Sequence, residues 1–369
     1  MKDPRLEKLA DVLVNYCTEI QTGDKVIIQG STLGEPLIKE VYAKVLQAGG
    51  LPLLMTALPG MDELQYRYAS DEQLGHVAEP YKLAFTTYDA RIYIHAQENT
   101  KGLTSVDPAK MALRRLAGKE LMETMLQRSA DGEFNWVITL YPTPAHAQDA
   151  EMGLAEYEDF VFGACMPDLD DPVGYWRDFS ARQDKIVEWL KGKSKVHVSA
   201  PGTDLHLSIA GRTFINADGH NNMPSGEVFT GPVEDSAEGH VTFSYPAIYA
   251  GHEVTGVQLW FEKGKVVRAT AEKNEEFLLS TLDTDDGSRY LGEFAIGTNE
   301  GINRFTGQIL FDEKIGGSFH MAVGAGYPET GSVNKSSVHW DMICDLRDGG
   351  EITVDDEVLY RNGRFVIDF

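Results

Sequence analysis

The sequence has few cysteines, a minority of basic residues among its charges and no long apolar run. Only Cys17, Cys165 and Cys344 occur among 369 residues, and none is in a CxxC spacing, which argues against a disulfide framework or a thiolate zinc site. No apolar run reaches the ~18 residues of a membrane span. The first residues, MKDP, lack the apolar core of a signal peptide. We therefore expect a cytoplasmic protein with no membrane partner.

The deficit of basic residues also excludes a class of partner. Lys and Arg number 33 against 57 Asp and Glu, which gives a net charge of −24. Nucleic acids and anionic lipids are bound mainly through Lys and Arg, so we expect no nucleic-acid partner. With 42% apolar and 10% aromatic residues, the composition is that of a folded chain, not a disordered one.

The first half of the chain alternates short apolar runs with helical patterns, which is typical of a parallel sheet flanked by helices. We expect strands at residues 24–30, 51–57, 90–97 and 135–142, and helices at 37–46, 105–128 and 171–190. A Lys-Gly-Lys-Ser stretch follows the last helix. The pattern predicts an α/β domain over residues 1–192.

After this stretch the apolar period changes from 3.6 to 2, which indicates antiparallel strands. Strand pairs flank the turns at 201–204, 263–265 and 362–363, and one helix is expected at 274–282. These features predict an α+β domain over residues 193–369. His197 and His206 fall at alternating strand positions, and we interpret them as exposed strand residues in preference to ligands.

One short motif suggests metal chemistry. If residues 338–344 form a strand, His339 and Asp341 project from the same face and Trp340 from the other, so that the pair could hold a cation. Upstream, His320 follows two consecutive glycines, and Tyr327 lies seven residues further on. Taken alone, an H-x-D motif is equally compatible with a surface His–Asp pair.

Three glutamates lie among small or apolar neighbours: Glu227, Glu293 and Glu313. An unpaired carboxylate in an apolar setting would cost several kcal/mol or take up a proton. A bound cation would offset this cost of burying a carboxylate. A glutamate that is half-exposed at a strand end would instead be solvated by water and would need no cation. Both interpretations are open for each glutamate taken singly.

Together these motifs resemble the thermophilic-aminopeptidase family of metallopeptidases. The resemblance rests on four motifs. They are NMPSGEVFT at 222–230, which contains Glu227, LGE at 291–293, GGSFH at 316–320 followed by Tyr327, and HWD at 339–341. It runs through the whole second half, while the first half resembles the family only in its α/β pattern. It implies peptide substrates with a free N-terminus, a homodimer, and two divalent ions of Zn, Co or Mn. The ligands it implies are Glu227, Glu293, Glu313, His320, His339 and Asp341.

In a two-metal hydrolase, paired ions lower the pKa of a water and polarise the carbonyl that it attacks. We expect Glu293, or another glutamate ligand, to bridge the ions and Tyr327 to donate a hydrogen bond to the oxyanion. The alternative is a mononuclear non-haem Fe(II) ring-cleaving dioxygenase of the hydroxypyridine type, which would use only His320, His339 and Asp341. The three glutamates favour the peptidase, because a single iron site does not need them.

Overall fold

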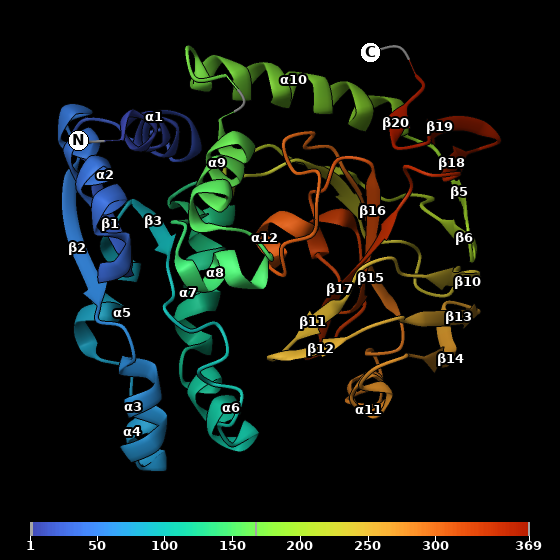
Figure 1. The fold of residues 1–369 in the computed structure, drawn as a ribbon, viewed down its shortest axis with the longest axis horizontal. Coiled ribbons are helices and arrows are strands. Elements are labelled where there is room, and N and C mark those ends of the chain that lie inside the picture. Colours follow the sequence, from blue (N-terminus) through green and yellow to red (C-terminus); the bar gives the residue numbers. More distant parts are fainter. Residues whose placement is uncertain (1–2, 167, 368–369) are drawn as a thin grey trace. The chain divides into compact units, whose positions relative to one another are not determined.

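The computed structural model describes residues 3–166 and 168–367, and the chain forms two compact units. The first unit comprises residues up to 176 together with 219–224, and the second comprises 177–218 and 225 onward. Figure 1 shows both units with most of their elements labelled. The division into domains at residue 192 stays a prediction.

The first unit contains a parallel five-stranded sheet in the order β2-β1-β3-β4-β8. Four of its strands are those predicted from the apolar runs, and the prediction of a parallel α/β region is confirmed. The short last strand, supplied by a distant part of the chain, was not predicted because two residues leave no pattern. The strands are β1 (Lys25–Ser31), β2 (Leu51–Ala57), β3 (Ala90–His95), β4 (Asn135–Leu140) and β8 (Asn222–Met223).

Helices connect these strands, and the buried face of α2 carries Leu37, Val41 and Val45. The helix predicted over 105–128 is wrong as a single element: Pro108 and the Asp107 cap start one helix, and Gly118 separates it from the next. No helix among the described residues has the length and apolar character to cross a bilayer. The helices are α1 (Pro4–Val12), η1 (Leu13–Cys17), η2 (Thr32–Gly34), α2 (Glu35–Gln47), α3 (Met61–Tyr68), α4 (Asp71–Leu74), α5 (Glu79–Thr87), α6 (Pro108–Ala117), α7 (Lys119–Ala130), α8 (Pro144–Asp149), α9 (Leu154–Cys165) and α10 (Pro172–Leu190).

The second unit is built mainly from two antiparallel sheets, as the period-2 pattern predicted. The eight-stranded sheet has the order β14-β13-β10-β6-β5-β18-β19-β20 and the five-stranded sheet the order β17-β16-β15-β9-β7. The first contains β5 (Lys195–Ala200), β6 (Thr203–Ser208), β10 (Glu238–Thr242), β13 (Gln258–Glu262), β14 (Lys265–Thr270), β18 (Glu351–Val354), β19 (Glu357–Arg361) and β20 (Arg364–Phe365). The second contains β7 (Ile215–Ala217), β9 (Glu227–Thr230), β15 (Leu291–Gly297), β16 (Ser318–Gly324) and β17 (His339–Asp345).

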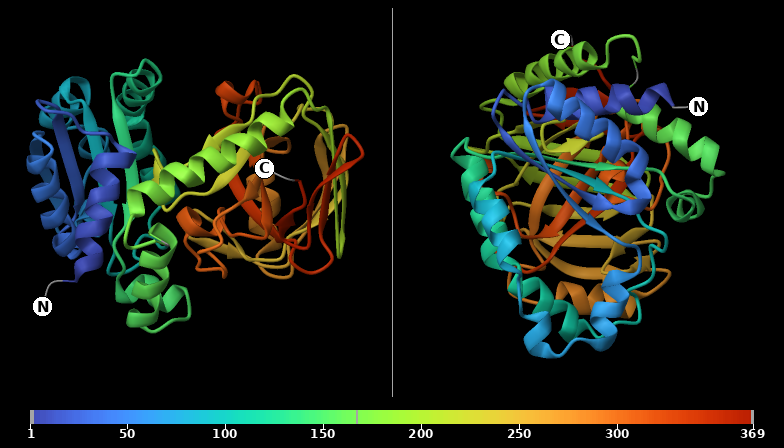
Figure 2. Two further views of the ribbon diagram at one scale, coloured as in Figure 1. Left: turned by 90° about the horizontal axis from the view of Figure 1, so that it is seen from above. Right: turned by 90° about the vertical axis from the view of Figure 1, so that its left-hand side faces the viewer.

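One apolar core lies between these two sheets (Figure 2). Val198, Leu205 and Leu259 enter it from the eight-stranded sheet, and Phe294 and Trp340 from the five-stranded sheet. The core therefore covers one face of the five-stranded sheet and leaves its other face to polar side chains. The remaining elements are the hairpin β11 (Ala247–Tyr249) and β12 (His252–Val254), and the helices α11 (Glu275–Leu282), α12 (Ile309–Asp312) and η3 (Pro328–Thr330).

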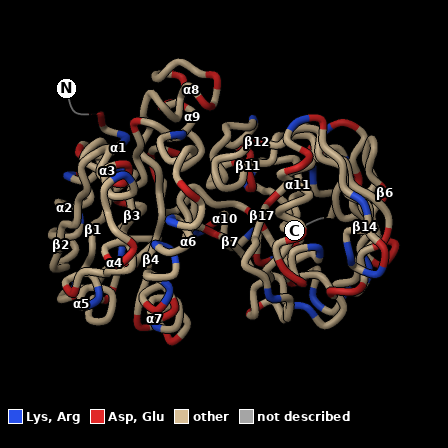
Figure 3. The backbone as a smooth tube through the Cα atoms, turned by 90° about the horizontal axis from the view of Figure 1, so that it is seen from below, with Lys and Arg blue, Asp and Glu red and all other residues tan. Residues whose placement is uncertain are grey.

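Acidic residues are distributed over both units and alternate along the backbone with basic ones (Figure 3). The net charge of −24 is therefore not concentrated in one segment.

Candidate metal centre

Five of the six predicted ligands lie on four neighbouring strands of the five-stranded sheet. Glu227 begins β9, Glu293 lies on β15, His320 on β16, and His339 and Asp341 on β17. Alternate residues of the same strands, such as Phe294, Met321 and Met342, enter the apolar core on the other face. Side chains two residues apart share a face of a strand, so the sheet gathers the polar group on the side away from the core.

Small residues separate the polar side chains on this face. Ala322 stands between Glu293 and Asp341 in the strand register. Ala295 lies opposite His320, and Gly324 opposite His339. Larger residues here would fill the space above the sheet, so the alternation of ligand and small residue leaves room for a bound group.

A β-bulge at Gly292 decides which way Glu293 points. Leu291 pairs with Val323, whereas Glu293 pairs with Ala322, so one extra residue lies on β15. Without it, Glu293 would share the core face with Leu291, because one residue of slip moves every side chain to the other face. A Cβ on Gly292 would lie 2.0 Å from the Ala325 carbonyl oxygen, so only glycine fits this bulge.

The sixth predicted ligand, Glu313, comes from the segment that follows α12 and crosses the polar face of the sheet. The backbone of Lys314 and Ile315 approaches β15 at Gly297, where a Cβ would lie 2.2 Å from the Ile315 carbonyl oxygen. Before Glu313, Asp312 is buried and accepts hydrogen bonds from the backbone N–H and hydroxyl of Thr306, both at 2.8 Å. These contacts hold the segment and bring Glu313 to the other five residues.

The six side chains form three overlapping groups with metal-ligand spacing. In each group one possible ligand atom per residue lies within 4.8 Å of the others. Glu293 belongs to two groups, and so do His320 and Asp341. The groups are Glu227, Glu293 and His320; Glu293, His339 and Asp341; and Glu313, His320 and Asp341.

The two histidines present nitrogen atoms to the carboxylates. Nε2 of His320 lies 3.3 Å from Glu227 Oε2 and 3.5 Å from Glu293 Oε1. Nε2 of His339 lies 3.3 Å from Glu293 Oε2 and 3.6 Å from Asp341 Oδ1. Nδ1 of His339 donates a hydrogen bond of 2.8 Å to the Ala325 carbonyl. That bond fixes the tautomer with Nε2 available, the usual arrangement for a metal-binding histidine.

Several buried polar atoms of this site have no hydrogen-bond partner among the described residues. They include Glu227 Oε2, His320 Nε2 and Asp341 Oδ1. Buried polar atoms are nearly always satisfied, so each exception needs an explanation. Nitrogen and oxygen donors without a thiolate suit a borderline or hard dication. The residues present therefore fit a bound divalent metal.

Burial and close charges shift the pKa values of the ligand set. Burial raises the pKa of Glu227 to about 8, with Lys314 acting in the opposite direction. Burial lowers the pKa of His320, but Glu293 and Glu227 outweigh it and raise the value to about 9. The same competition, with Asp341 and Glu293 as partners, raises the pKa of His339 to about 12. The metal-free site thus retains protons that a bound dication would displace.

Lys314 is a member of the site that the sequence analysis missed. Its side chain is fully buried, its ammonium contacts the carboxylate of Glu313, and Nζ lies 3.7 Å from Glu227 Oε1. Burial acts to lower the pKa of Lys314, but Glu313 and Glu227 raise it above the ordinary value. A lysine beside a predicted ligand was the available signal, but lysine is rarely buried, so this position alone does not indicate a site residue.

Tyr327 stands at the edge of the group. Its ring makes edge contacts with Phe229, at 5.4 Å between centroids, and with His339, at 5.3 Å. Partial burial of the phenol, followed by the charge of Glu293, raises the pKa of Tyr327 well above its usual range. The phenol therefore keeps its proton at neutral pH and is available as a hydrogen-bond donor.

A sequence profile identifies the family. The profile of the thermophilic metalloprotease family (M29) matches residues 2–365, nearly the whole chain. The chain belongs to this family. The resemblance noted in the sequence is thus confirmed, and because metalloproteases are hydrolases, so is the prediction of an enzyme.

Relatives of this metalloprotease cover its whole length. It is 28% identical to aminopeptidase T of Thermus thermophilus, over 97% of this chain and 95% of the relative. It is 26% identical to aminopeptidase 2 of Geobacillus stearothermophilus, over 99% of this chain and 98% of the relative. The solved structure of wild-type AmpT from Thermus thermophilus matches with a TM-score of 0.86 and 25% identity, over 98% of this chain and 99% of that one. The predicted fold is confirmed.

A metalloprotease family implies a divalent metal, and the clustered nitrogen and oxygen donors agree with it. None of these findings supports the dioxygenase alternative. The individual roles of the six clustered residues and of Tyr327 stay predictions.

Proposed function

We propose that the chain is an aminopeptidase that uses two divalent ions to hydrolyse peptides from a free N-terminus. Its relatives in the family are named aminopeptidases, which supports the substrate class. The proposed ligands are Glu227, Glu293, Glu313, His320, His339 and Asp341, with Zn, Co or Mn as the ion.

One observation carries the proposal of two ions. Glu293 belongs to two separate candidate groups, one with Glu227 and His320 and the other with His339 and Asp341. Its two oxygens face different histidines, with Oε1 toward His320 and Oε2 toward His339. A carboxylate placed in this way is suited to bridge two cations. A site for one iron would need only His320, His339 and Asp341, and would leave the carboxylates of Glu227 and Glu313 buried without a metal.

Two dications bound here would lower the pKa of a water held between them and polarise the substrate carbonyl. The side chains supply the remaining functions. Glu293 would link the two halves of the site, and a nearby carboxylate would accept the proton of the attacking water. Tyr327, which keeps its proton, donates a hydrogen bond to the oxyanion that develops on the carbonyl.

Lys314 changes the charge balance of the site. The four carboxylates alone would match two dications, with the imidazoles neutral. The buried ammonium of Lys314 adds one positive charge close to Glu313 and Glu227, so the loaded site carries a net charge of +1. An excess positive charge stabilises the negative charge that develops in the transition state. The substrate amine would bind a metal or nearby acidic groups, which limits cleavage to the N-terminal residue.

We also propose that the enzyme is cytoplasmic and homodimeric. The three cysteines in no disulfide-type spacing agree with a reducing compartment. The homodimer is supported by exposed apolar side chains along β2, an edge strand of the first unit.

The decisive experiment counts bound metal and measures both candidate reactions. The purified protein is loaded separately with Zn, Co, Mn or Fe(II), and metal per chain is determined. It is then assayed on an amino-acid p-nitroanilide, and on a dihydroxypyridine with Fe(II) and oxygen. We expect two ions per chain and anilide hydrolysis. One iron per chain with oxygen uptake would overturn the proposal.

A further inference from the structure

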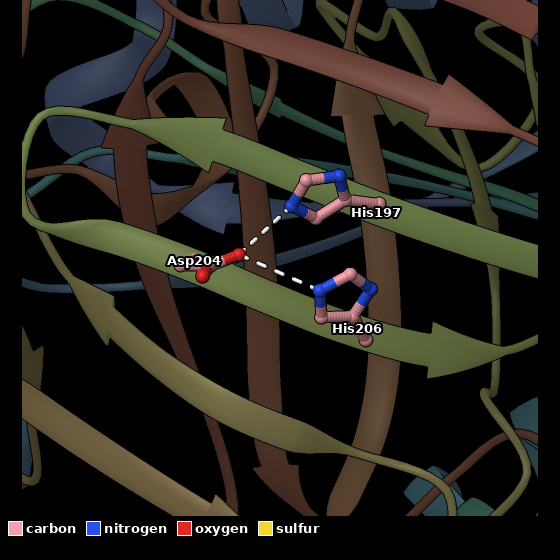
Figure 4. A group of neighbouring side chains, drawn as sticks. All are labelled: His197, Asp204 and His206. Atoms are coloured by element: carbon pink, nitrogen blue, oxygen red, sulfur yellow. Dashed lines mark hydrogen bonds and ion pairs between the residues drawn. The ribbon is translucent and has the colours of Figure 1, made fainter. Parts of the chain in front are cut away.

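Two histidines and an aspartate stand together on the eight-stranded sheet, away from the candidate metal centre. His197 lies on β5, and Asp204 and His206 lie on β6. Figure 4 shows both imidazoles directed toward the carboxylate of Asp204. Val196, Val198, Leu205 and Leu207, which alternate with them, enter the apolar core, so the three polar side chains occupy the outer face.

Strand register places the two imidazoles side by side. His197 pairs directly with His206 across the β5–β6 hairpin. Asp204 precedes His206 by two residues and therefore shares its face. The rings are stacked, with centroids 4.1 Å apart and planes inclined by 5°. The backbone pairing thus places the two rings next to each other before any ligand binds.

The distances agree with those between ligands of one tetrahedral ion. Nε2 of His197 lies 2.8 Å from Asp204 Oδ1, and Nε2 of His206 lies 3.5 Å from the same oxygen. Zn–N and Zn–O bonds of 2.0–2.2 Å at tetrahedral angles give ligand separations of about 3.3 Å. One possible ligand atom of each residue lies within 4.8 Å of the others. Because an imidazole binds an ion in its own ring plane, the two stacked rings must turn toward each other to place all three side chains around one ion.

The surroundings favour an ionised carboxylate and leave room for further ligands. The hydrogen bond from His197, with His206 and His240 nearby, lowers the pKa of Asp204. His240 lies opposite Asp204 on the adjacent strand β10. A pocket of about 310 Å³ borders His197 and His206 and is also lined by Ser208 and Ser236. An ion held by three side chains could complete its coordination from this pocket with water.

We propose that His197, Asp204 and His206 form a second, non-catalytic metal site for a borderline divalent transition metal such as Zn²⁺. Two imidazoles and one carboxylate are a ligand set that such ions favour. A hydrogen-bonded His–Asp pair alone would need only one of the two histidines. The ion would join β5 to β6 on the outer face of the sheet and stabilise the hairpin.

The test counts zinc ions per chain by equilibrium dialysis over a range of free Zn²⁺, in wild type and in the double variant H197Q/H206Q. We expect wild type to bind one ion per chain more than the double variant, and the variant's affinity for that ion to be at least about tenfold weaker. H76Q, which removes an exposed histidine elsewhere, should bind as many ions as wild type. Equal binding by wild type and double variant across the range would overturn the proposal.

Two further measurements separate this site from the catalytic centre and from a folding defect. Hydrolysis of the p-nitroanilide should be the same in wild type, H197Q/H206Q and H76Q, which shows that the variants are folded. Bound Cu²⁺ should show nitrogen couplings in its electron paramagnetic resonance spectrum that H197Q/H206Q lacks at the corresponding ion. If hydrolysis is absent in all three proteins, the proposed activity fails, but the difference in zinc count still decides this proposal.

Discussion

At the scale of single residues, Lys314 is the side chain whose removal should change the metal centre most informatively. It is fully buried and contacts Glu313 and Glu227. Removing one partner of a buried ion pair costs about 3–5 kcal/mol. In K314M the metal-free carboxylates lose their cation, whereas bound dications would still neutralise them. We expect the thermal midpoint to fall by roughly 5–15 °C in EDTA, and by much less in the metal-loaded protein.

The matched control for this prediction is K273M. Lys273 forms an exposed ion pair with Glu253, at 2.8 Å, and exposed pairs contribute about 0–1 kcal/mol. Thermal unfolding of both variants, with EDTA and with metal, gives the comparison. If K314M and K273M show the same small difference between the two conditions, Lys314 is not coupled to the metal ligands.

The hydroxyl of Tyr327 has a different expected role from that of the ligands. In Y327F the ring can keep its edge contacts with Phe229 and His339, so the number of bound ions should not change. Loss of one hydrogen-bond donor to the oxyanion lowers kcat by roughly 10²-fold. Metal analysis and steady-state kinetics on the same preparation check both parts. A normal kcat would exclude the role assigned to the phenol.

At the scale of elements, Asp285 connects the turn before β15 to the loop before β17. It accepts hydrogen bonds from Ser336 Oγ at 2.7 Å, Ser337 N at 2.7 Å, Ser337 Oγ at 2.9 Å and Ser288 Oγ at 2.8 Å. The loop that it holds leads directly into His339. Burial acts to raise the pKa of Asp285, but these hydrogen bonds lower it well below the ordinary value.

This lowered pKa predicts the acid stability of the fold. The stabilisation is present above the unfolded-state pKa of about 4 and is lost as pH falls through the folded-state value. At pH 7, D285N should be less stable than wild type by about 2 kcal/mol. The difference should shrink progressively below pH 4. Urea unfolding between pH 3 and 7, with the exposed neighbour variant D286N as control, measures it, and a difference that is independent of pH would contradict the prediction.

Periodicity along the chain was sufficient to predict most elements, because apolar runs of period 2 and 3.6 report which face is buried. Four of the five strands of the parallel sheet and the hairpins around residues 263–265 and 362–363 were predicted in this way. The two-residue period of a strand fails where one residue is inserted. Leu291 and Glu293 are two apart and should share a face, yet the bulge at Gly292 separates them, which follows from a contact with Ala325 that is distant in sequence.

Pairing across strands explains the other features that could not be predicted. His197 and His206 were correctly placed on strands, but their stacking depends on the hairpin register. A turn at residues 201–202 would have indicated that register, whereas the sequence analysis placed the turn at 201–204. The burial of Lys314 depends on how closely its backbone approaches Gly297. Neither contact leaves a periodic signal along the chain.

At the scale of the whole molecule, the net charge of −24 opposes association of two copies, so a dimer needs an apolar surface. The first unit offers exposed apolar side chains along its edge strand and just after it, which together we call the edge patch. It consists of Leu51 and Leu54 on β2, Leu58 after it, and Met61, Leu64 and Tyr68 on α3, all of them exposed. β2 is the outermost strand of its sheet (Figure 1), and an exposed apolar edge strand is a site where another chain pairs.

We therefore expect the chain, of 40.8 kDa, to sediment as a homodimer that the variant L54E/L58E converts to monomer. Each introduced glutamate places a charge in the edge patch, next to the same charge on the other copy if the interface is two-fold symmetric. Higher salt should strengthen the wild-type dimer by screening the net charge. L116E alters an exposed leucine on α6, outside the edge patch, and should remain dimeric. Analytical ultracentrifugation of the three proteins decides, and a wild-type monomer or a dimeric L54E/L58E would exclude this interface.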